Sequence, residues 1–274
     1  MSRVTIQAAV TMGQLQRKLD LIGHNMANSS TTGYKSQQAD FSSLLFQQID
    51  NLKDPEANAQ GRVTPDGVRI GSGAVIGHTN LNLKQGSIKE TGRALDVALL
   101  KENHLFQVGV RENGIEEAQL TRSGEFYISP VEDGQVLLTD KNGNPVFGAN
   151  GEILIEEGFD SITIANNGQV LVTRNGVEEN VAQLAIVEAV YPRLLEQVGN
   201  NNFRLPLAAQ EDYNVDEVFR IPDQIEVKSG ALETSNVDLS HQMTELLATQ
   251  RAYQLNARSI SMSDQMAGLV NQLR

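Results

Sequence analysis

The chain contains no cysteine and no tryptophan, and aromatic residues make up only 5% of its 274 positions. Without cysteine there is no disulfide, no thiolate metal ligand and no cysteine nucleophile. Scarce aromatic residues suit an elongated molecule better than a thick globule. The hydrophobic content of 40% is ordinary, so the chain still has enough apolar material for a core. Its length allows two domains, or one domain with appendages.

Long apolar runs are also missing, and none approaches the 18 residues that a membrane span requires. The N-terminal segment interrupts its apolar positions with Gln7, Thr11 and Gln14, which excludes an ordinary signal peptide. The net charge is −12, although the first 35 residues carry more basic than acidic side chains. This acidic balance argues against nucleic-acid binding. We therefore expect no membrane insertion, and any work outside the cytoplasm would need a dedicated export route.

The last stretch, from Leu232 to Arg274, has no proline and a single glycine, Gly268, and it predicts one long helix. Ser235, with Asp238 three residues on, resembles a capping box at its start. Apolar or compatible residues recur with alternating steps of four and three, which is the coiled-coil period. The predicted seam consists of Leu239, Met243, Leu246, Gln250, Tyr253, Ala257 and Ile260. A second stripe follows on another face, with Ser259, Met262, Met266, Leu269 and Leu273. Two apolar sides predict more than one neighbouring helix.

The first segment mirrors the last, because its apolar residues take the same alternating steps without a proline. Its predicted seam consists of Ala8, Met12, Leu15, Leu19, Ile22 and Met26. Gly13 and Gly23 weaken such a helix by about 1 kcal/mol each, so it needs a partner. The C-terminal helix is the nearest candidate, which would pair the two chain ends as a coiled-coil hairpin.

The N-terminal helix should end near Asn28, where Ser, Thr and Gly replace the seam residues. Gly33 can supply a positive φ there and Tyr34 can anchor the exit. A weak helical period follows from Gln37 to Asn51. The segment Asn51 to Gly77 is rich in Gly and Pro and reads as an extended arm.

From Leu81 to Glu226 the period changes to two, which predicts an all-β body built as a sandwich or irregular barrel. Asn-Gly dipeptides at Asn113, Asn142, Asn150, Asn167 and Asn175 suit type I′ hairpins. The clearest predicted hairpin joins Ile162–Ala165 to Gln169–Thr173. The predicted strands are 81–83, 97–100, 105–110, 126–128, 136–138, 153–155, 162–164, 170–172 and 184–190. The predicted fold class is mainly β with long terminal helices, divided as 1–35 (N-terminal helix), 36–80 (arm), 81–230 (all-β domain) and 231–274 (C-terminal helix).

No pattern in the chain indicates catalysis, a metal site or a cofactor. The histidines His24, His78, His104 and His241 have no partner at helical metal-binding spacing, so each is expected to be a surface or hydrogen-bonded residue. Glycines 71, 73 and 77 do not have the spacing of a dinucleotide loop. Adjacent glutamates at 116–117, 156–157 and 178–179 would point to opposite faces of a strand, so they do not form a facing carboxylate pair. We expect no cofactor and no enzyme.

Two terminal motifs resemble those of the bacterial flagellar axial proteins, the rod and hook subunits. The first is IGHNMANSSTTGYKSQQADF, from Ile22 to Phe41, and it contains the matching positions Ala27, Asn28, Thr32, Gly33, Tyr34 and Lys35. The second is ETSNVDLSHQMTELLATQRAYQLNARSIS, from Glu233 to Ser261, followed by SDQM. The body resembles the family more weakly, at Asp96–Ala98, Phe106–Val108 and Thr121–Phe126. At Lys101–Val108 the chain departs from the family, because it lacks the usual glycine and has Leu105 in an aromatic place.

The resemblance implies an inner tube of coiled-coil helices, an arm that contacts neighbours and an outer β domain. It also implies self-assembly with other rod and hook proteins and export by the flagellar type III apparatus without a cleaved signal peptide. The protein would then be an extracytoplasmic, non-catalytic subunit of the basal body. The IGSG sequence at Ile70–Gly73 and the chain length look more like the distal rod than the hook. The alternatives are a hook or hook-associated subunit and, from a different class, a glycan-binding or glycan-cleaving cell-wall protein.

Overall fold

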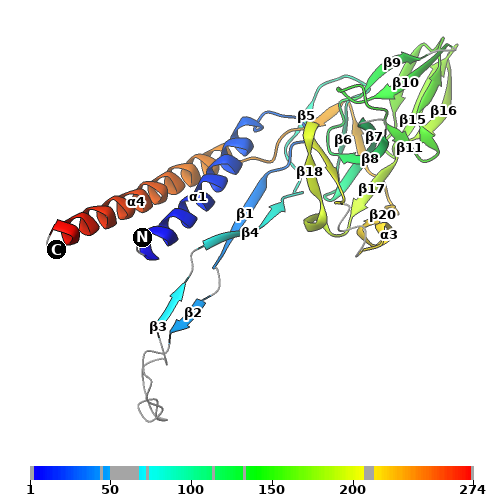
Figure 1. Cartoon of the computed structure of the whole chain (residues 1–274). Coiled ribbons are helices and arrows are strands. Elements are labelled where there is room, and N and C mark those ends of the chain that lie inside the picture. Colours follow the sequence, from blue (N-terminus) through cyan, green and yellow to red (C-terminus); the bar gives the residue numbers. More distant parts are fainter. Residues whose placement is uncertain are drawn as a thin grey trace. The chain divides into compact units, whose positions relative to one another are not determined.

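The computed structural model describes residues 3–43, 46–49, 68–71, 74–112, 115–131, 134–206 and 213–272. It is mainly β with one long helix near each terminus, as the sequence predicts (Figure 1). The chain divides into two compact units. Unit 1 contains Met1–His24, Gln38–Thr79 and Leu239–Arg274, and unit 2 contains Asn25–Gln37 and Asn80–Asp238. The β body is therefore an insertion between the two helices.

Helix α1 spans Arg3–Ala27 and ends at the predicted place. Ala8, Leu15 and Ile22 are its most buried apolar residues, and they lie seven positions apart. That spacing returns each side chain to the same face of a helix in a coiled-coil register. The N-terminal seam thus coincides with a face that is covered within a single chain.

Helix α4 spans Leu239–Gln272, so it begins later than the sequence suggests. The prediction of a helix from Leu232 is wrong, because Ala231–Glu233 forms strand β22, which pairs with β5 (Ile88–Glu90). Ser235 does not start the helix. Its hydroxyl instead accepts a hydrogen bond from the Val237 amide, within the loop. Strand pairing therefore overrides local helix propensity at these positions.

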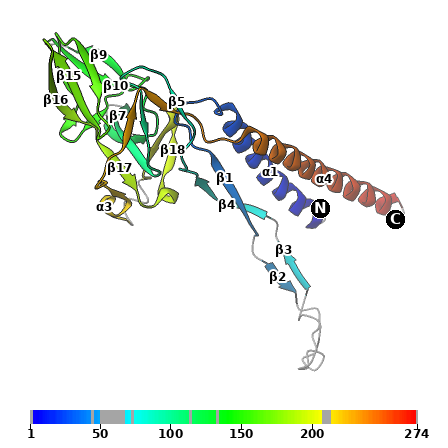
Figure 2. The same ribbon diagram turned by 180° about the vertical axis from the view of Figure 1, so that it is seen from behind.

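The two helices lie side by side and run in opposite directions, so that the N and C ends meet at the same end of the pair (Figures 1 and 2). An ion pair of 3.0 Å joins Lys18 of α1 to Glu245 of α4. Both partners are partly exposed, so this pair contributes at most about 1 kcal/mol. It shows which turns of the two helices lie opposite each other.

The arm begins with strand β1 (Gln37–Ser43), which pairs with β4 (Ala74–Leu81). A second antiparallel pair joins β2 (Phe46–Ile49) to β3 (Val68–Gly71). The weak helical period predicted for 37–51 is therefore wrong. Four apolar residues at helical spacing favour a helix here, but backbone pairing with a segment distant in sequence makes these residues strands instead. Positions 44–45, 50–67 and 72–73 of the predicted arm lie outside the described residues.

A six-stranded sheet forms the centre of unit 2, in the order β18-β19-β8-β7-β17-β20. Its middle pair is the hairpin of β7 (His104–Glu112) and β8 (Ile115–Thr121). The other strands are β17 (Ile186–Ala189), β18 (Glu196–Val198), β19 (Asn202–Arg204) and β20 (Phe219–Arg220). A short helix, α3 (Val215–Val218), and two 3₁₀ turns, η3 (Pro192–Leu194) and η4 (Gly199–Asn201), connect these outer strands.

Two three-stranded sheets complete the body. One has the order β13-β10-β9, and the other has the order β14-β15-β16. Their strands are β9 (Tyr127–Val131), β10 (Gln135–Thr139), β13 (Leu154–Glu156), β14 (Ser161–Ile164), β15 (Gln169–Arg174) and β16 (Val177–Gln183). Smaller pairs join β21 (Val227–Ser229) to β6 (Val97–Leu99) and β11 (Phe147–Gly148) to β12 (Gly151–Glu152). The main core draws buried side chains from both sheets and from the central sheet, and Phe106 meets Phe126 edge to face with ring centres 5.1 Å apart.

The hairpin predicted at Ile162–Ala165 and Gln169–Thr173 is confirmed, with Ile162 opposite Val172. Only Gly168 has a positive φ in its turn, so the turn is not of type I′. The type I′ expectation holds at Asn175–Gly176, where φ is 51° and 78°. The dipeptide at Asn113 lies outside the described residues. The strand predicted at 81–83 is wrong, because β4 ends at Leu81 and residues 82–87 form no strand. Strands β1 to β5, β8, β11, β12, β16 and β18 to β22 were not predicted, since most are short, polar or both.

Candidate functional site: the terminal helices and their junction with the β body

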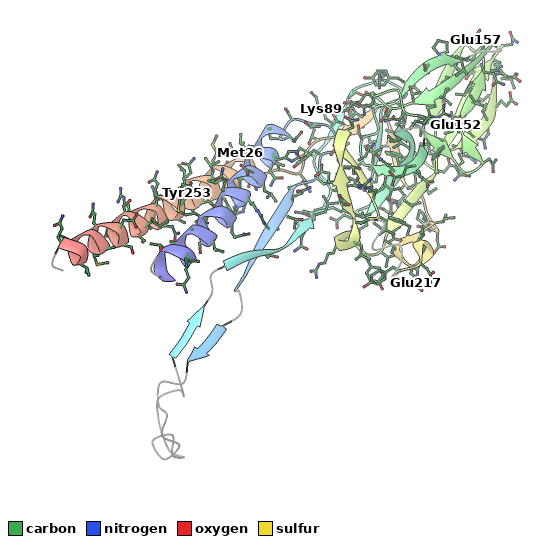
Figure 3. The ribbon with its side chains drawn as sticks, viewed as in Figure 1. Met26, Lys89, Glu152, Glu157, Glu217 and Tyr253 are labelled. Atoms are coloured by element: carbon green, nitrogen blue, oxygen red, sulfur yellow. The ribbon has the colours of Figure 1, made fainter. Side chains whose placement is uncertain are left out.

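Helix α4 carries large apolar side chains that the single chain leaves in water. Eight of them are between 44% and 65% exposed, namely Leu239, Met243, Leu247, Leu255, Met262, Met266, Leu269 and Val270. Figure 3 shows side chains projecting from α4 on the side turned away from α1. Single exposed leucines are normal on a protein surface, but eight large apolar side chains exposed along one helix are unusual.

The structure divides the predicted seam residues between covered and exposed positions. In α1, Leu15 and Ile22 are buried and Met12, Leu19 and Met26 are half-buried. In α4, Leu246, Tyr253, Ala257 and Ile260 are half-buried, whereas Met243, Met266 and Leu269 are exposed. Part of the α4 seam is thus covered in one chain, and the rest remains available to neighbours.

Polar residues occupy the best covered positions of α4, which the apolar seam did not indicate. Gln242 and Thr249 are the buried residues of this helix and lie seven positions apart. The Thr249 hydroxyl donates to the Glu245 carbonyl at 2.7 Å, which satisfies it within the helix. A heptad count of polar as well as apolar residues would have found this face.

The motif residues that follow α1 form a turn held tightly against the β body. Gly33 has φ +66°, and an added Cβ would lie 2.6 Å from the Ser123 amide nitrogen. Its own amide donates to the Glu233 carbonyl at 2.8 Å. Tyr34 is buried, and its hydroxyl donates to Asn25 Oδ1 at 2.9 Å. The predicted positive φ and anchoring aromatic are therefore both confirmed.

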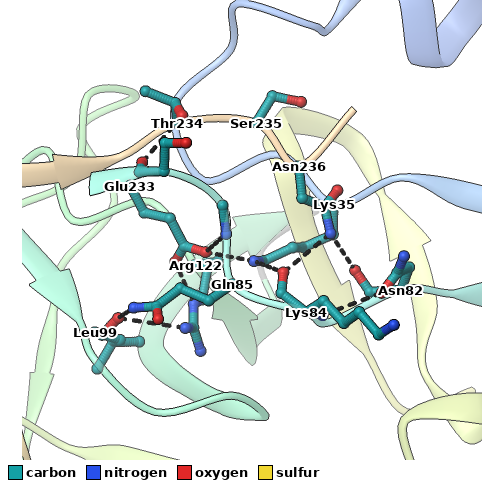
Figure 4. A network of polar contacts seen from close by, with 12 residues as sticks. Lys35, Asn82, Lys84, Gln85, Leu99, Arg122, Glu233, Thr234, Ser235 and Asn236 are labelled. Atoms are coloured by element: carbon teal, nitrogen blue, oxygen red, sulfur yellow. Dashed lines mark hydrogen bonds and ion pairs between the residues drawn. The ribbon is translucent and has the colours of Figure 1, made fainter. Parts of the chain in front are cut away.

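A buried ion cluster of Lys35, Arg122 and Glu233, the junction cluster, joins both terminal motifs to the β body (Figure 4). Glu233 Oε1 accepts from Lys35 Nζ at 2.6 Å, and Glu233 Oε2 accepts from Arg122 Nε at 2.6 Å. Lys35 also donates to the Lys84 carbonyl at 2.7 Å, and the Gly86 amide donates to Glu233 Oε1 at 2.7 Å. A buried charge persists only when it is paired and hydrogen-bonded in this way.

In the junction cluster, Lys35 and Arg122 share the carboxylate of Glu233. Burial shifts the pKa of Lys35 and of the adjacent Tyr34. Desolvation lowers the pKa of Lys35 to about 8, although Glu233 opposes the shift. Desolvation raises the pKa of the adjacent Tyr34 to about 12. Both shifts follow from the loss of water around a group that would carry charge.

Asn236 completes the junction between the residues that precede α4 and those that follow α1. Its side-chain nitrogen donates to the Asn82 carbonyl at 2.7 Å, and its oxygen accepts from the Ser36 amide at 2.8 Å. The motif Thr32 hydroxyl donates to Glu125 at 2.7 Å. Every one of these contacts lies in unit 2, so both motifs are fixed to the body at the points where the chain enters and leaves it.

Asn103 explains the departure at Lys101–Val108. It has φ 59°, so it adopts the left-handed backbone conformation for which glycine is the usual residue. The turn therefore forms without glycine, and Leu105 is fully buried behind it.

The histidines and adjacent glutamates singled out in the sequence lie in different surroundings. No group of three or more His, Cys, Asp or Glu side chains gathers among the described residues. Glu156 and Glu179 instead form ion pairs with Arg174. The histidines were expected to be exposed or hydrogen-bonded, and His104 is an exception. It is buried, and its Nδ1 has no hydrogen-bond partner among the described residues. Burial lowers its pKa, so the ring is neutral near pH 7.

Comparison with known proteins agrees with this architecture. A family model described as the C-terminal part of the flagellar basal body rod FlgEFG proteins matches residues 228–273, which contain α4 and the strands before it. The flagellar hook-basal body complex protein FlhP of Bacillus subtilis is 39% identical over 279 residues, covering 100% of both chains. The flagellar basal-body rod protein FlgG of Agrobacterium fabrum is 30% identical over 269 residues, covering 96% of each.

A chain with a long helix near each terminus and a β body inserted between them in sequence, whose relatives are basal-body proteins, is a structural subunit. The chain belongs to the family of flagellar basal-body rod proteins. Within the described residues, no helix is long and apolar enough to cross a membrane.

Proposed function

We propose that the protein is a structural subunit of the bacterial flagellar basal-body rod whose copies assemble into a hollow tube through coiled-coil contacts of α1 and α4. The row of exposed apolar side chains on α4 carries this proposal. Full burial of a Leu or Met side chain contributes roughly 1.5 to 3 kcal/mol. One chain has a single partner helix for α4, so a second copy is needed to cover the remaining face.

The proposed assembly interface contains the predicted seam of both helices, with Met266 and Leu269 on the second stripe. The half-buried members, such as Leu19 and Leu246, would each contact the other helix of the same chain and also a neighbouring copy. The exposed members would contact neighbours alone. In this arrangement, α1 (Arg3–Ala27) and α4 (Leu239–Gln272) build the tube, residues 36–80 form the arm, and the β body, including β22, forms the outer domain.

The junction cluster supports this assignment of segments, because it binds the residues after α1 and the residues before α4 to the β body. The partners would be further copies, other flagellar rod and hook proteins and the type III export apparatus. The location would be the extracytoplasmic basal body, reached without cleavage of a signal peptide.

The exposed face of α4 allows a direct test by substitution. Leu269→Asp places a charge on a side chain that is 60% exposed in the single chain, so the monomer should still fold. Assembly should fail, since burial of an unpaired charge costs several kcal/mol. Gln265→Asp, one turn earlier and also exposed, is the matched control. Swimming motility and filament formation by the purified chain are the measurements, and normal assembly of Leu269→Asp would overturn the proposal.

Leu19→Asp and Leu246→Asp test the seam between the helices in the same assays. Both residues are half-buried within the chain, so circular dichroism must first show that each variant retains its helices. If a variant is folded and still assembles normally, the seam between the helices is not part of the assembly interface. The exposed face of α4 would then remain as the proposed interface.

A distal rod position is our preferred location within the axial structure, and a hook or hook-associated position is the alternative. We propose that the arm determines which of these positions the subunit occupies. Exchange of residues 51–77 with the arm of a hook subunit should change where the subunit incorporates. Incorporation at an unchanged position would show that the arm does not determine location.

A glycan-cleaving function is the alternative from another class. Two of the glutamates from the adjacent pairs, Glu156 and Glu179, both form ion pairs with Arg174, which gives them a structural role as its counter-ions. A turbidity assay on purified cell wall tests it. A measurable clearing rate that disappears on substitution of one carboxylate would establish catalysis.

A further inference from the structure

Helix α1 has an exposed stripe of mostly small residues, separate from the face marked by Ala8, Leu15 and Ile22 that the chain itself covers. The stripe advances by alternating steps of four and three residues, which keeps its side chains in one row along the helix. Its members are Ala9, Gly13, Gln16, Asp20, Gly23 and Ala27, and all six are exposed. An added Cβ at Gly13 or Gly23 would meet nothing within 4 Å, so another helix can approach this row closely.

Helix α4 has an exposed stripe of large apolar residues in its second half. Leu255, Met262, Met266 and Leu269 are between 56% and 62% exposed, and Arg258 is exposed in the same row. Their steps of three and four residues average the period of an α-helix, so the five side chains lie on one side of it. The two helices therefore present shapes of opposite kind, with projecting side chains on α4 and a shallow surface on α1.

Each stripe contains one charge of opposite sign, Asp20 on α1 and Arg258 on α4. Neither residue forms an ion pair with any other described residue of the chain. Opposite charges set among apolar or small residues select a partner and fix its register. The charges and the shapes together make the α4 stripe of a second copy the partner for the α1 stripe.

One antiparallel register satisfies the shapes and the charges at the same time. When Arg258 lies opposite Asp20, Leu255 lies opposite Gly23 and Leu269 lies opposite Ala9. Met266 then lies beside Gly13, so each large side chain of α4 meets a small residue of α1. A parallel alignment with the same charge pair would instead place Arg251 opposite Gly13 and Ser261 opposite Gly23. The residue pattern therefore favours the antiparallel register.

This register cannot form within one chain. There, Lys18 pairs with Glu245, which places Asp20 level with Met243 in the antiparallel pair. Arg258 is 15 residues further along α4, a displacement of roughly 22 Å at 1.5 Å per residue. The Arg258 that meets Asp20 must therefore belong to another molecule.

We propose that the exposed stripe of α4 in one copy packs antiparallel onto the exposed stripe of α1 in a neighbouring copy, with Arg258 opposite Asp20. Because the contact joins two different faces and displaces each copy along the helix axis, it repeats from copy to copy as a helical assembly and does not close as a two-fold dimer. The proposal rests on the self-assembly proposed above. It adds the partner surface on α1 and the register.

Cysteine trapping tests the register directly, because the chain has no cysteine of its own. One chain carries Ala9→Cys or Gly23→Cys, and a second chain with a tag of different size carries Leu269→Cys or Leu255→Cys. All four positions are exposed, so the single chain should tolerate the changes. The chains are mixed at a concentration at which the protein assembles and are then oxidised.

The matched mixtures are Ala9→Cys with Leu269→Cys and Gly23→Cys with Leu255→Cys. Exchanging the partners gives two mismatched mixtures, each displaced by 14 residues or roughly 21 Å, too far for a disulfide. Mixed disulfide dimer should form at least about tenfold more in the matched mixtures, since only they bring the two Cα atoms within about 7 Å. Equal yields, or more dimer in the mismatched mixtures, would overturn the register.

A charge exchange provides the second arm of the test. Asp20→Arg or Arg258→Asp alone should raise the protein concentration needed for assembly about tenfold, and the double variant should recover most of the loss. Arg251→Asp is the matched control on α4, because it lies opposite Ala27 in this register and Asp20→Arg should not rescue it. Loss without recovery in the Asp20→Arg, Arg258→Asp double variant would contradict the pairing.

The outcomes separate this proposal from the proposed function. If Leu269→Asp still abolishes assembly while the matched and mismatched mixtures give equal dimer, the register is rejected and assembly through the helices stands. If the unmodified chain forms no assembly at any concentration, both are rejected.

Discussion

Arg122 and Glu233 lie 111 positions apart in the chain and form an ion pair of 2.6 Å between Nε and Oε2, with both side chains buried. Lys35 adds a second cation from the opposite end of the sequence. Three segments that are separate in sequence therefore meet at one carboxylate. The stability of this meeting point and the covering of α4 can each be tested on the purified chain.

Glu233→Gln should be the most destabilising single change in the junction cluster. It leaves Lys35 and Arg122 buried without a counter-charge, and removal of one partner from a buried pair costs about 3 to 5 kcal/mol. Lys35→Met should cost less, since Arg122 and Glu233 then remain as a neutral pair. The measurement is the free energy of unfolding in urea. Glu90→Gln, which removes an exposed partner of Lys228, is the control and should leave the free energy of unfolding nearly unchanged, because water screens an exposed ion pair.

The stability of the chain should depend on pH in the alkaline range in two opposite ways. The pKa of Lys35 is about 8 in the folded state against an ordinary 10.5, so the unfolded state binds more protons between these values and stability rises with pH. The pKa of Tyr34 is about 12 against an ordinary 10.0, so the folded state keeps a proton that the unfolded state loses and stability falls over that interval.

The free energy of unfolding in urea, measured over this pH range for the wild type and for two variants, tests each effect separately. Lys35→Met should flatten the rise, and Tyr34→Phe should flatten the fall. A wild-type profile that decreases steadily from about pH 8 upward would contradict the Lys35 assignment.

Gly33→Ala and Gly23→Ala should change stability in opposite directions. At Gly33 an L residue is strained by about 1 to 2 kcal/mol at φ +66°, and its Cβ would clash with the Ser123 backbone. At Gly23 nothing lies within 4 Å of an added Cβ, so the helix should gain about 1 kcal/mol. Thermal unfolding of the two variants is the measurement, and equal shifts would show that the Gly33 turn is not constrained as described.

Ile22→Asp and Leu269→Asp should separate folding from assembly. Ile22 is buried within the chain, so a carboxylate there should destabilise the monomer by about 3 kcal/mol or more. Leu269 is exposed, so its substitution should leave monomer unfolding unchanged and act only on assembly. The free energy of unfolding, measured at a protein concentration too low for assembly, distinguishes the two variants. A large loss of monomer stability in Leu269→Asp would mean that α4 is covered within one chain.

The sequence was sufficient for features that depend on local periodicity and turn chemistry. The heptads of α1, its end before Asn28, the positive φ of Gly33 and the hairpin at Ile162–Thr173 all follow from residues close to one another in the chain. The two terminal motifs were also sufficient for the family, because each is a contiguous run of residues.

Only the tertiary structure decided what depends on segments far apart in sequence. Strand β22 replaces a predicted helical turn because Glu233 pairs with β5 and binds Arg122 and Lys35. The face of α4 that is covered within one chain is marked by Gln242 and Thr249 rather than by the most apolar stripe. A periodic pattern determines that a helix has a face to bury, whereas the partner that covers it is determined by packing in three dimensions.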